Sequence, residues 1–276
     1  MKRVFRPFAI ACITALSLTA CQKDTKEATT ADPGALTEAT LAKIDALGFS
    51  TENARKVDGG YLVEGDIVLT EENLSNPASS PSLLIANEEQ YRTTNLVKGL
   101  PRVITVSVTN MPLVYSQATD EAIARYNALP NKQLTFQRAA TGAKGVIDIF
   151  GFDEGPSGGY ITLGSSGFPT AAGDPYNQVK MNTNAQAYGS NPDLNYVASV
   201  IQHEIGHCIG FRHTDYMNRA YSCGGRRSNE GSAGVGAIQI TGTPSKADAE
   251  SFMLACSNGG NRTFNANDKI AMDYLY

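Results

Sequence analysis

All three histidines of this 276-residue chain lie between positions 203 and 213. His203 and His207 are four residues apart, so on a helix their side chains lie on one face and can bind the same metal ion. Gly210 follows, and a glycine can adopt the left-handed conformation that ends a helix and turns the chain. Such a turn can bring His213 back to the ion. The spacing therefore predicts a helix and a turn with three imidazoles around one metal.

This ligand set indicates a catalytic zinc site. Three neutral imidazoles and a water leave a position open to substrate, whereas a structural zinc site normally closes with a fourth protein ligand. Glu204 lies one step round the helix, where its carboxylate can act as a general base on the water. Zinc lowers the pKa of its water to about 7 and polarises a carbonyl. We therefore expect one Zn2+ ion and hydrolysis of peptide bonds without a covalent intermediate.

The run of residues 203–215, H-E-I-G-H-C-I-G-F-R-H-T-D, resembles the metzincin zinc metallopeptidases and, within them, the bacterial dual-action HEIGH metallopeptidases. The likeness continues in residues 222–225 and 264–268, and it covers most of the chain from about Gly60 onward. The resemblance implies an α+β metzincin-type fold. Such a fold has a twisted mixed sheet, a zinc-binding active-site helix and a C-terminal subdomain with a methionine-containing turn.

The same resemblance suggests roles for residues outside the helix. Met253 would be the methionine of the turn, forming a floor beneath the histidines without binding the metal. Several metzincins carry a tyrosine two residues after that methionine, but Ala255 occupies the place here. The residue that stabilises the oxyanion is therefore unassigned, and the zinc itself is expected to be the main electrophile.

Two aspartates are candidates near the metal. Asp66 lies in a segment that resembles the inhibitory pro-segment of astacin-type metzincins, in which an aspartate coordinates the zinc in place of water. We therefore expect Asp66 to be a zymogen switch, with a turn aspartate in a hairpin as the alternative. Asp215 follows His213 by two residues, and we expect it to orient a ligand imidazole without binding the metal itself. A solvated loop residue is the alternative for Asp215.

The N-terminus has the features of a lipoprotein signal peptide, which would end at residue 20. A basic start precedes an apolar stretch, residues 8–18, which is too short to span a bilayer but suits a secretory signal. Leu-Thr-Ala-Cys, ending at Cys21, resembles a bacterial lipobox, and a plain signal with an incidental cysteine is the alternative. Gln22 resembles the pattern that allows sorting to the outer membrane. We therefore expect an exported protein, anchored by lipid to the outer membrane of a Gram-negative bacterium, on its periplasmic face or the cell surface.

Three cysteines would remain after export and acylation, in a compartment where disulfides persist. A bridge between Cys223 and Cys256 would fasten a loop under the zinc site. Pairing of Cys208 with Cys223 is nearly as favourable, and spacing does not decide between them. Cys208 is not expected to bind the metal, because it projects about 100° away from His207 on the helix.

The remaining chain divides into three predicted regions. Residues 21–35 form a tether, residues 36–101 a pro-segment-like region, and residues 102–276 the metallopeptidase domain. The second region should begin with a helix capped by Thr37 and continue with a strand over residues 60–69. The elements expected in the third region are strands 103–109, 134–138, 145–152, 160–164 and 178–181, and helices 118–129, 194–209 and 268–275.

Composition is consistent with a globular exported enzyme. The net charge is −4 and no long basic run follows the first few residues, which gives no reason to expect nucleic-acid binding. We expect a zinc endopeptidase with protein or peptide substrates and a membrane contact through the lipid. The alternatives are a zinc-binding surface lipoprotein without activity, and an amidase on cell-wall peptides. Glu204 favours an enzyme, because a structural site has no need of a base.

Overall fold

A computed structural model describes residues 35–47, 49–75, 90–130, 133–157, 159–225, 229, 237–244 and 247–276. These residues belong to one compact unit, Gly34–Tyr276. The predicted signal peptide, Cys21 and nearly all of the tether lie outside the described residues. In the part of the chain that is described, no helix is both long and apolar enough to cross a membrane.

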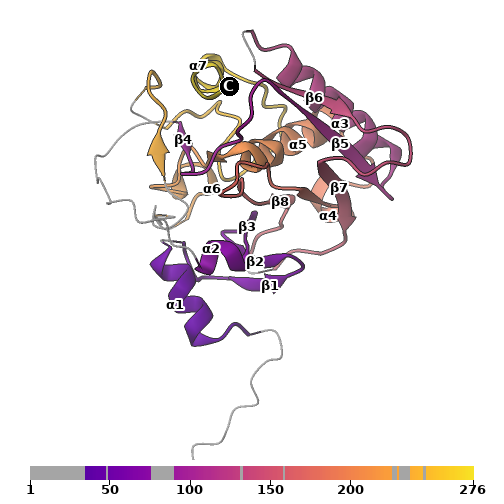
Figure 1. Cartoon of the computed structure of the whole chain (residues 1–276). Coiled ribbons are helices and arrows are strands. Elements are labelled where there is room, and N and C mark those ends of the chain that lie inside the picture. The colour runs from indigo at the N-terminus through magenta and orange to yellow at the C-terminus, as the bar shows by residue number, and fades with distance from the viewer. Residues whose placement is uncertain are drawn as a thin grey trace, which may run out of the picture. The chain divides into compact units, whose positions relative to one another are not determined.

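A mixed eight-stranded sheet forms the centre of the unit, in the order β1-β2-β3-β8-β9-β7-β5-β6 (Figure 1). Its body is parallel: β6 pairs with β5, β5 with β7, and β7 with β9. Strand β8 is antiparallel to β9. The bounds are β5 Arg102–Thr109, β6 Leu134–Arg138, β7 Ile147–Phe152, β8 Gly164–Ser166 and β9 Gln178–Asn182.

The N-terminal region adds three short strands to this sheet. They are β1 Arg55–Val57, β2 Gly60–Val63 and β3 Ile67–Leu69, joined as antiparallel neighbours. Strand β3 then runs parallel to β8, with Ile67 beside Ser166. The edge of β8 that faces away from β9 is therefore occupied by the N-terminal region.

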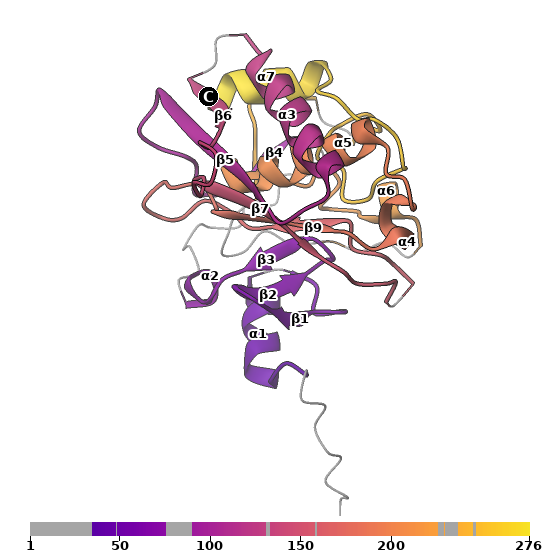
Figure 2. The ribbon, with the colours of Figure 1, turned by 90° about the vertical axis from the view of Figure 1, so that its right-hand side faces the viewer.

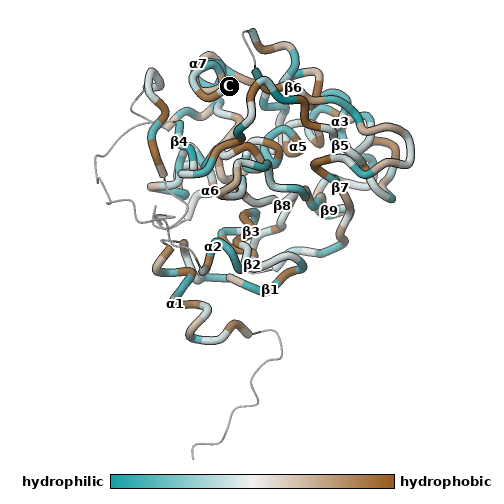
Figure 3. The backbone as a smooth tube through the Cα atoms, in the orientation of Figure 1, coloured by the Kyte–Doolittle hydropathy of each residue, from teal (hydrophilic) through white to brown (hydrophobic). Residues whose placement is uncertain are grey.

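Two long helices, α3 Leu113–Asn127 and α5 Leu194–Ile209, cover one face of the sheet (Figure 2). Helix α5 begins where the Asp193 side chain accepts the Tyr196 N–H, and it ends at Gly210, whose φ is 110°. Hydrophobic residues recur along these helices and the strands beneath them (brown in Figure 3). The other helices are α1 Glu38–Ala46, α2 Glu71–Ser75, α4 Ala185–Tyr188, α6 Ala220–Cys223 and α7 Ala266–Leu275.

A second sheet joins distant parts of the chain, in the order β10-β4-β11. Its strands are β10 Phe211–Arg212, β4 Tyr91–Arg92 and β11 Ile238–Gln239. Just before β4, the Gln90 side-chain amide donates to Ser251 and Asp268. Residues 90–92 therefore pack with the C-terminal half.

The apolar core has two parts. The larger cluster lies between the central sheet and helices α3 and α5. The smaller cluster is formed by side chains from α1 to α2, including Ile44, Phe49 and Leu69, and Phe168 is its one member from beyond residue 75 among the described residues. The N-terminal region thus has an apolar cluster of its own, closed by a single side chain from the part of the chain that begins at residue 90.

The expected α+β fold with a mixed sheet is confirmed, and helix α5 has the predicted bounds. The single strand expected over residues 60–69 is wrong, because the chain turns back between β2 and β3. Glu64 and Gly65 have φ values of 58° and 97°, which break an extended strand. The strand expected at residues 160–164 begins at its last residue and forms β8 instead.

Gly206 brings the active-site helix against the turn that carries Met253. A Cβ atom placed on Gly206 would lie 2.6 Å from Met253 Sδ and 2.9 Å from Phe252 Cε2. Both of these side chains are buried, so neither can move into solvent. Any side chain at this position would force the helix and the turn apart.

We predict that Gly206→Ala lowers the free energy of unfolding by about 1–3 kcal/mol, the usual cost of overpacking a core. Alanine is the better helix former by about 1 kcal/mol, so without the clash the change would stabilise α5. Urea denaturation measures the difference. Asn195→Ala, at an exposed position of the same helix, serves as the control. A stabilised Gly206→Ala variant would show that the contact is loose.

Candidate metal centre

The three histidines converge as the spacing predicts. His203 and His207 project from α5, and the turn at Gly210 leads through β10 to His213. His207 Nε2 lies 3.2 Å from His213 Nε2. One nitrogen of each ring and a carboxylate oxygen of Asp66 all lie within 4.8 Å of one another, a grouping that can hold a metal ion.

Backbone carbonyls hold two of the rings. His203 Nδ1 lies 2.9 Å from the Phe252 oxygen, and His207 Nδ1 lies 2.9 Å from the Phe211 oxygen. A carbonyl oxygen only accepts, so each Nδ1 carries the hydrogen and each Nε2 presents a lone pair to the centre. The sequence did not predict either partner, because every residue carries a backbone carbonyl and the residue type does not indicate which one accepts.

The centre fits a cation. His203 Nε2 is buried and has no hydrogen-bond partner among the described residues. Burial holds the pKa of His207 well below its usual range, which keeps that ring neutral. The spacing of the His207 and His213 nitrogens is close to the roughly 3.3 Å between ligands of a tetrahedral zinc ion. Lone pairs gathered in this way are stabilised by a metal and by little else.

Glu204 lies buried beside the imidazoles. Ser166 Oγ, on β8, donates to Glu204 Oε2 at 2.8 Å. Burial, together with repulsion from Asp66, raises the pKa of Glu204 well above its ordinary value. A carboxylate with a raised pKa accepts a proton readily. No sequence pattern pointed to Ser166, which comes from a different element, 38 positions earlier.

Asp66 reaches the centre from the turn between β2 and β3. Its Oδ2 lies 3.0 Å from His213 Nε2 and 3.7 Å from His203 Nε2. The Asp66 backbone oxygen accepts the Ser166 N–H at 2.9 Å. A carboxylate of the N-terminal region thus lies on the open side of the three histidines.

Met253 is fully buried, in the turn whose Phe252 carbonyl faces His203. Asp215 is buried too, but its hydrogen-bond partners differ from the expected imidazole. Its carboxylate accepts from the backbone N–H of Ala255 and from the N–H and hydroxyl of Ser222. Asp215 therefore ties the loop after His213 to the turn after Met253.

A disulfide joins Cys223 and Cys256, with an S–S distance of 2.09 Å. This is one of the two pairings that the spacing left open. Cys208 is a buried free thiol on α5. The bridge fastens α6 to the chain just beyond Met253, so covalent and hydrogen-bonded links reinforce the same side of the metal centre.

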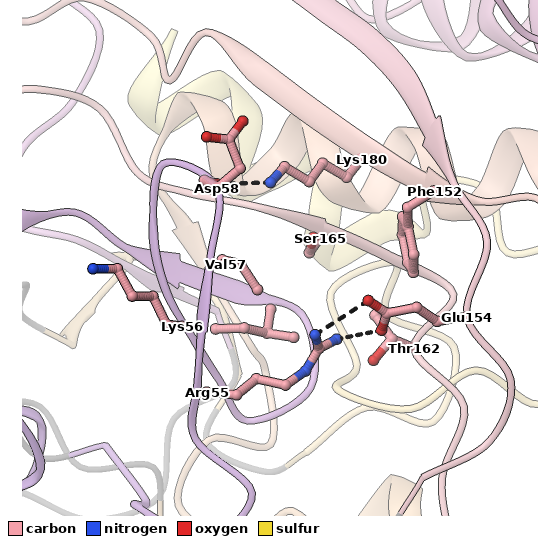
Figure 4. Close-up of a pocket in the computed structure, with 10 residues that line it drawn as sticks. Arg55, Lys56, Val57, Asp58, Phe152, Glu154, Thr162, Ser165 and Lys180 are labelled. Atoms are coloured by element: carbon pink, nitrogen blue, oxygen red, sulfur yellow. Dashed lines mark hydrogen bonds and ion pairs between the residues drawn. The ribbon is translucent and has the colours of Figure 1, made fainter. Parts of the chain in front are cut away.

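A cavity of about 200 Å3 lies between the β1–β2 hairpin and strands β7 to β9 (Figure 4). Arg55 pairs with Glu154 at 2.6 Å, and Lys180 donates to the Asp58 carbonyl at 2.7 Å. None of the metal-facing residues lines this cavity. It marks the seam between the N-terminal region and the rest of the unit, and the chemistry lies elsewhere.

Known proteins were compared with the chain. The family model described as dual-action HEIGH metallo-peptidase matches residues 61–276. No curated protein matches. One solved structure of myroilysin is 17% identical with a TM-score of 0.40, covering 66% of this chain and 95% of that one. A hatching enzyme zinc-protease of the medaka fish Oryzias latipes, high choriolytic enzyme 1, is 14% identical with a TM-score of 0.36, covering 63% of this chain and 88% of that one. Since the family model spans most of its length, the chain belongs to the dual-action HEIGH metallopeptidases and is a zinc metallopeptidase.

Proposed function

We propose that the chain is an endopeptidase in which Glu204 is the general base. The observation that carries this proposal is the position of the Glu204 carboxylate. It lies on the same helix as His203 and His207, buried and held by the Ser166 hydroxyl. A site that served structure alone would not need a buried carboxylate there, since burying an ionisable group is costly.

Each of these residues would have its own role in peptide hydrolysis. His203, His207 and His213 bind the zinc through their Nε2 lone pairs. When bound, the zinc supplies a water of lowered pKa and a Lewis acid for the peptide carbonyl. Glu204 accepts the proton of the attacking water and later donates it to the leaving amine. Ser166 holds one carboxylate oxygen and leaves the other to carry the proton.

We predict that Glu204→Gln lowers peptide cleavage roughly 100- to 10,000-fold, the range for loss of a general base, and leaves one zinc ion bound. Cleavage of casein and peptides, measured together with zinc content, tests this. Glu250→Gln, at an exposed glutamate, should change neither. Full activity in Glu204→Gln would assign the base elsewhere, and loss of zinc would make Glu204 a ligand.

We also propose that the region ending near residue 75 is an inhibitory segment and that Asp66 is its switch. The 3.0 Å approach of Asp66 to His213 supports this. Strand β3 lies on the outer edge of β8, where an extended substrate backbone could otherwise pair. Residues 90–92 pack with the catalytic half, so a cut between residues 76 and 89 would separate the two parts.

We predict that Asp66→Ala raises the peptidase activity of the uncut chain about tenfold, in line with the loss of one charge-assisted contact. The reason is that the segment would lose its hold on the metal centre while its strands remain. Asp58→Ala, at an exposed residue of the same hairpin region, is the matched control. Equal activity of the two variants and the parent would show that Asp66 is an ordinary turn residue.

We propose finally that the chain is exported and carries lipid on Cys21. The support is the sequence of residues 1–22 alone, which lies outside the described residues. Cells fed with labelled palmitate should label the protein, and Cys21→Ser should abolish the label. Secretion of unlabelled parent protein would leave a plain signal peptide as the explanation.

A further inference from the structure

The loop after the third histidine carries an arginine that pairs with the N-terminal segment. Arg219 Nη1 lies 3.6 Å from Glu64 Oε2, and the two side chains are 16% and 1% exposed. The other Glu64 oxygen accepts the Ser50 N–H at 2.9 Å. Glu64 precedes the metal-facing Asp66 by two residues. A buried carboxylate of the N-terminal segment is therefore paired with a cation of the catalytic half.

A second arginine extends the same contact. Arg212, which precedes His213, is fully buried, and its guanidinium carbon lies 4.7 Å from the centre of the Phe49 ring. The Tyr216 and Phe168 rings are 5.6 Å and 6.0 Å away, and Phe168 also contacts His207 edge to face. Phe49 belongs to the segment, whereas both other rings belong to the catalytic half. Arg212 thus lies between the segment and the metal centre.

Release of the segment would change the charge of this region. Glu64 and Asp66 would leave together, while Arg212 and Arg219 would stay in the catalytic half. Release would remove the buried Glu64 carboxylate from Arg219. The guanidinium group matches a carboxylate in shape and can bind it through two hydrogen bonds. The opened cleft would therefore favour an acidic group.

We propose that Arg219 is a specificity-determining residue that binds an acidic side chain of the substrate near the scissile bond. In the latent chain, Glu64 occupies the place of that side chain. This inference rests on the proposed function, in which the segment fills the substrate cleft. Arg212, stacked on aromatic rings, adds positive potential to the same wall. The substrates are then proteins and peptides with Glu or Asp close to the cleaved bond.

The test uses the full chain with a site for a sequence-specific protease inserted between residues 76 and 89. After the cut, at nanomolar dilution, the chain is given peptide pairs that differ only by Glu or Gln. In successive pairs, the Glu or Gln stands at each of the three positions on either side of the scissile bond. We expect Glu to raise kcat/KM about tenfold at one position, as for a hydrogen-bonded ion pair. Arg219→Gln should bring that ratio near one.

The control is Arg138→Gln, which removes an arginine paired with Asp120 at the opposite edge of the sheet. It should keep the preference for Glu. The proposal is overturned if the parent cuts both peptides equally, or if Arg219→Gln retains the preference, and the peptidase function then still stands.

A binding measurement separates this proposal from the peptidase function. The cut Glu204→Ala variant, which should hold peptides without cleaving them, is titrated with the same pairs by fluorescence anisotropy. We expect the Glu peptide to bind about tenfold more tightly, and Arg219→Gln to remove the difference. If the parent cleaves no peptide, the peptidase proposal fails. The ratio of the affinities for the Glu and Gln peptides then still decides whether Arg219 binds an acidic side chain.

Discussion

The hydrogen bond between the Phe252 carbonyl and His203 Nδ1 is the contact on which the metal centre depends. It fixes which nitrogen of the ring faces the other ligands, and it requires the turn to lie against α5. Gly206 permits that approach, because no side chain intervenes between the helix and Met253. The methionine therefore acts through packing: it fills the space that keeps the carbonyl at hydrogen-bonding distance from the ring.

The same turn is held from three directions. Asp268 accepts the Phe252 N–H and the Ser251 hydroxyl, and the Gln90 amide joins this buried network. Asp215 and the disulfide secure the chain just beyond it. Residues as far apart in the chain as Gln90 and Asp268 thus contribute to the position of the His203 imidazole.

The sequence predicted the elements whose signals are local. Helix α5 has the expected bounds because its cap, its apolar period and its terminal glycine all lie within one run of residues. The turn at Glu64 was missed because a left-handed glutamate is rare and leaves no pattern. Strands β4, β10 and β11 have only two residues each, which is too short for any alternation to show. Ser166 and Arg219 became visible only when distant elements met.

The position of β4 in the sequence determines which fragment would carry the proposed lipid after a cut. In the sequence, everything before residue 76, including the proposed lipid on Cys21, precedes residues 76–89, whereas β4 and the three histidines of the metal centre follow them. The anchor and the inhibitor are therefore parts of the same fragment. With both proposals in place, a single cut would free the enzyme from the membrane as it frees the cleft. The latent form would be bound to the membrane, and the active form would be a diffusible enzyme.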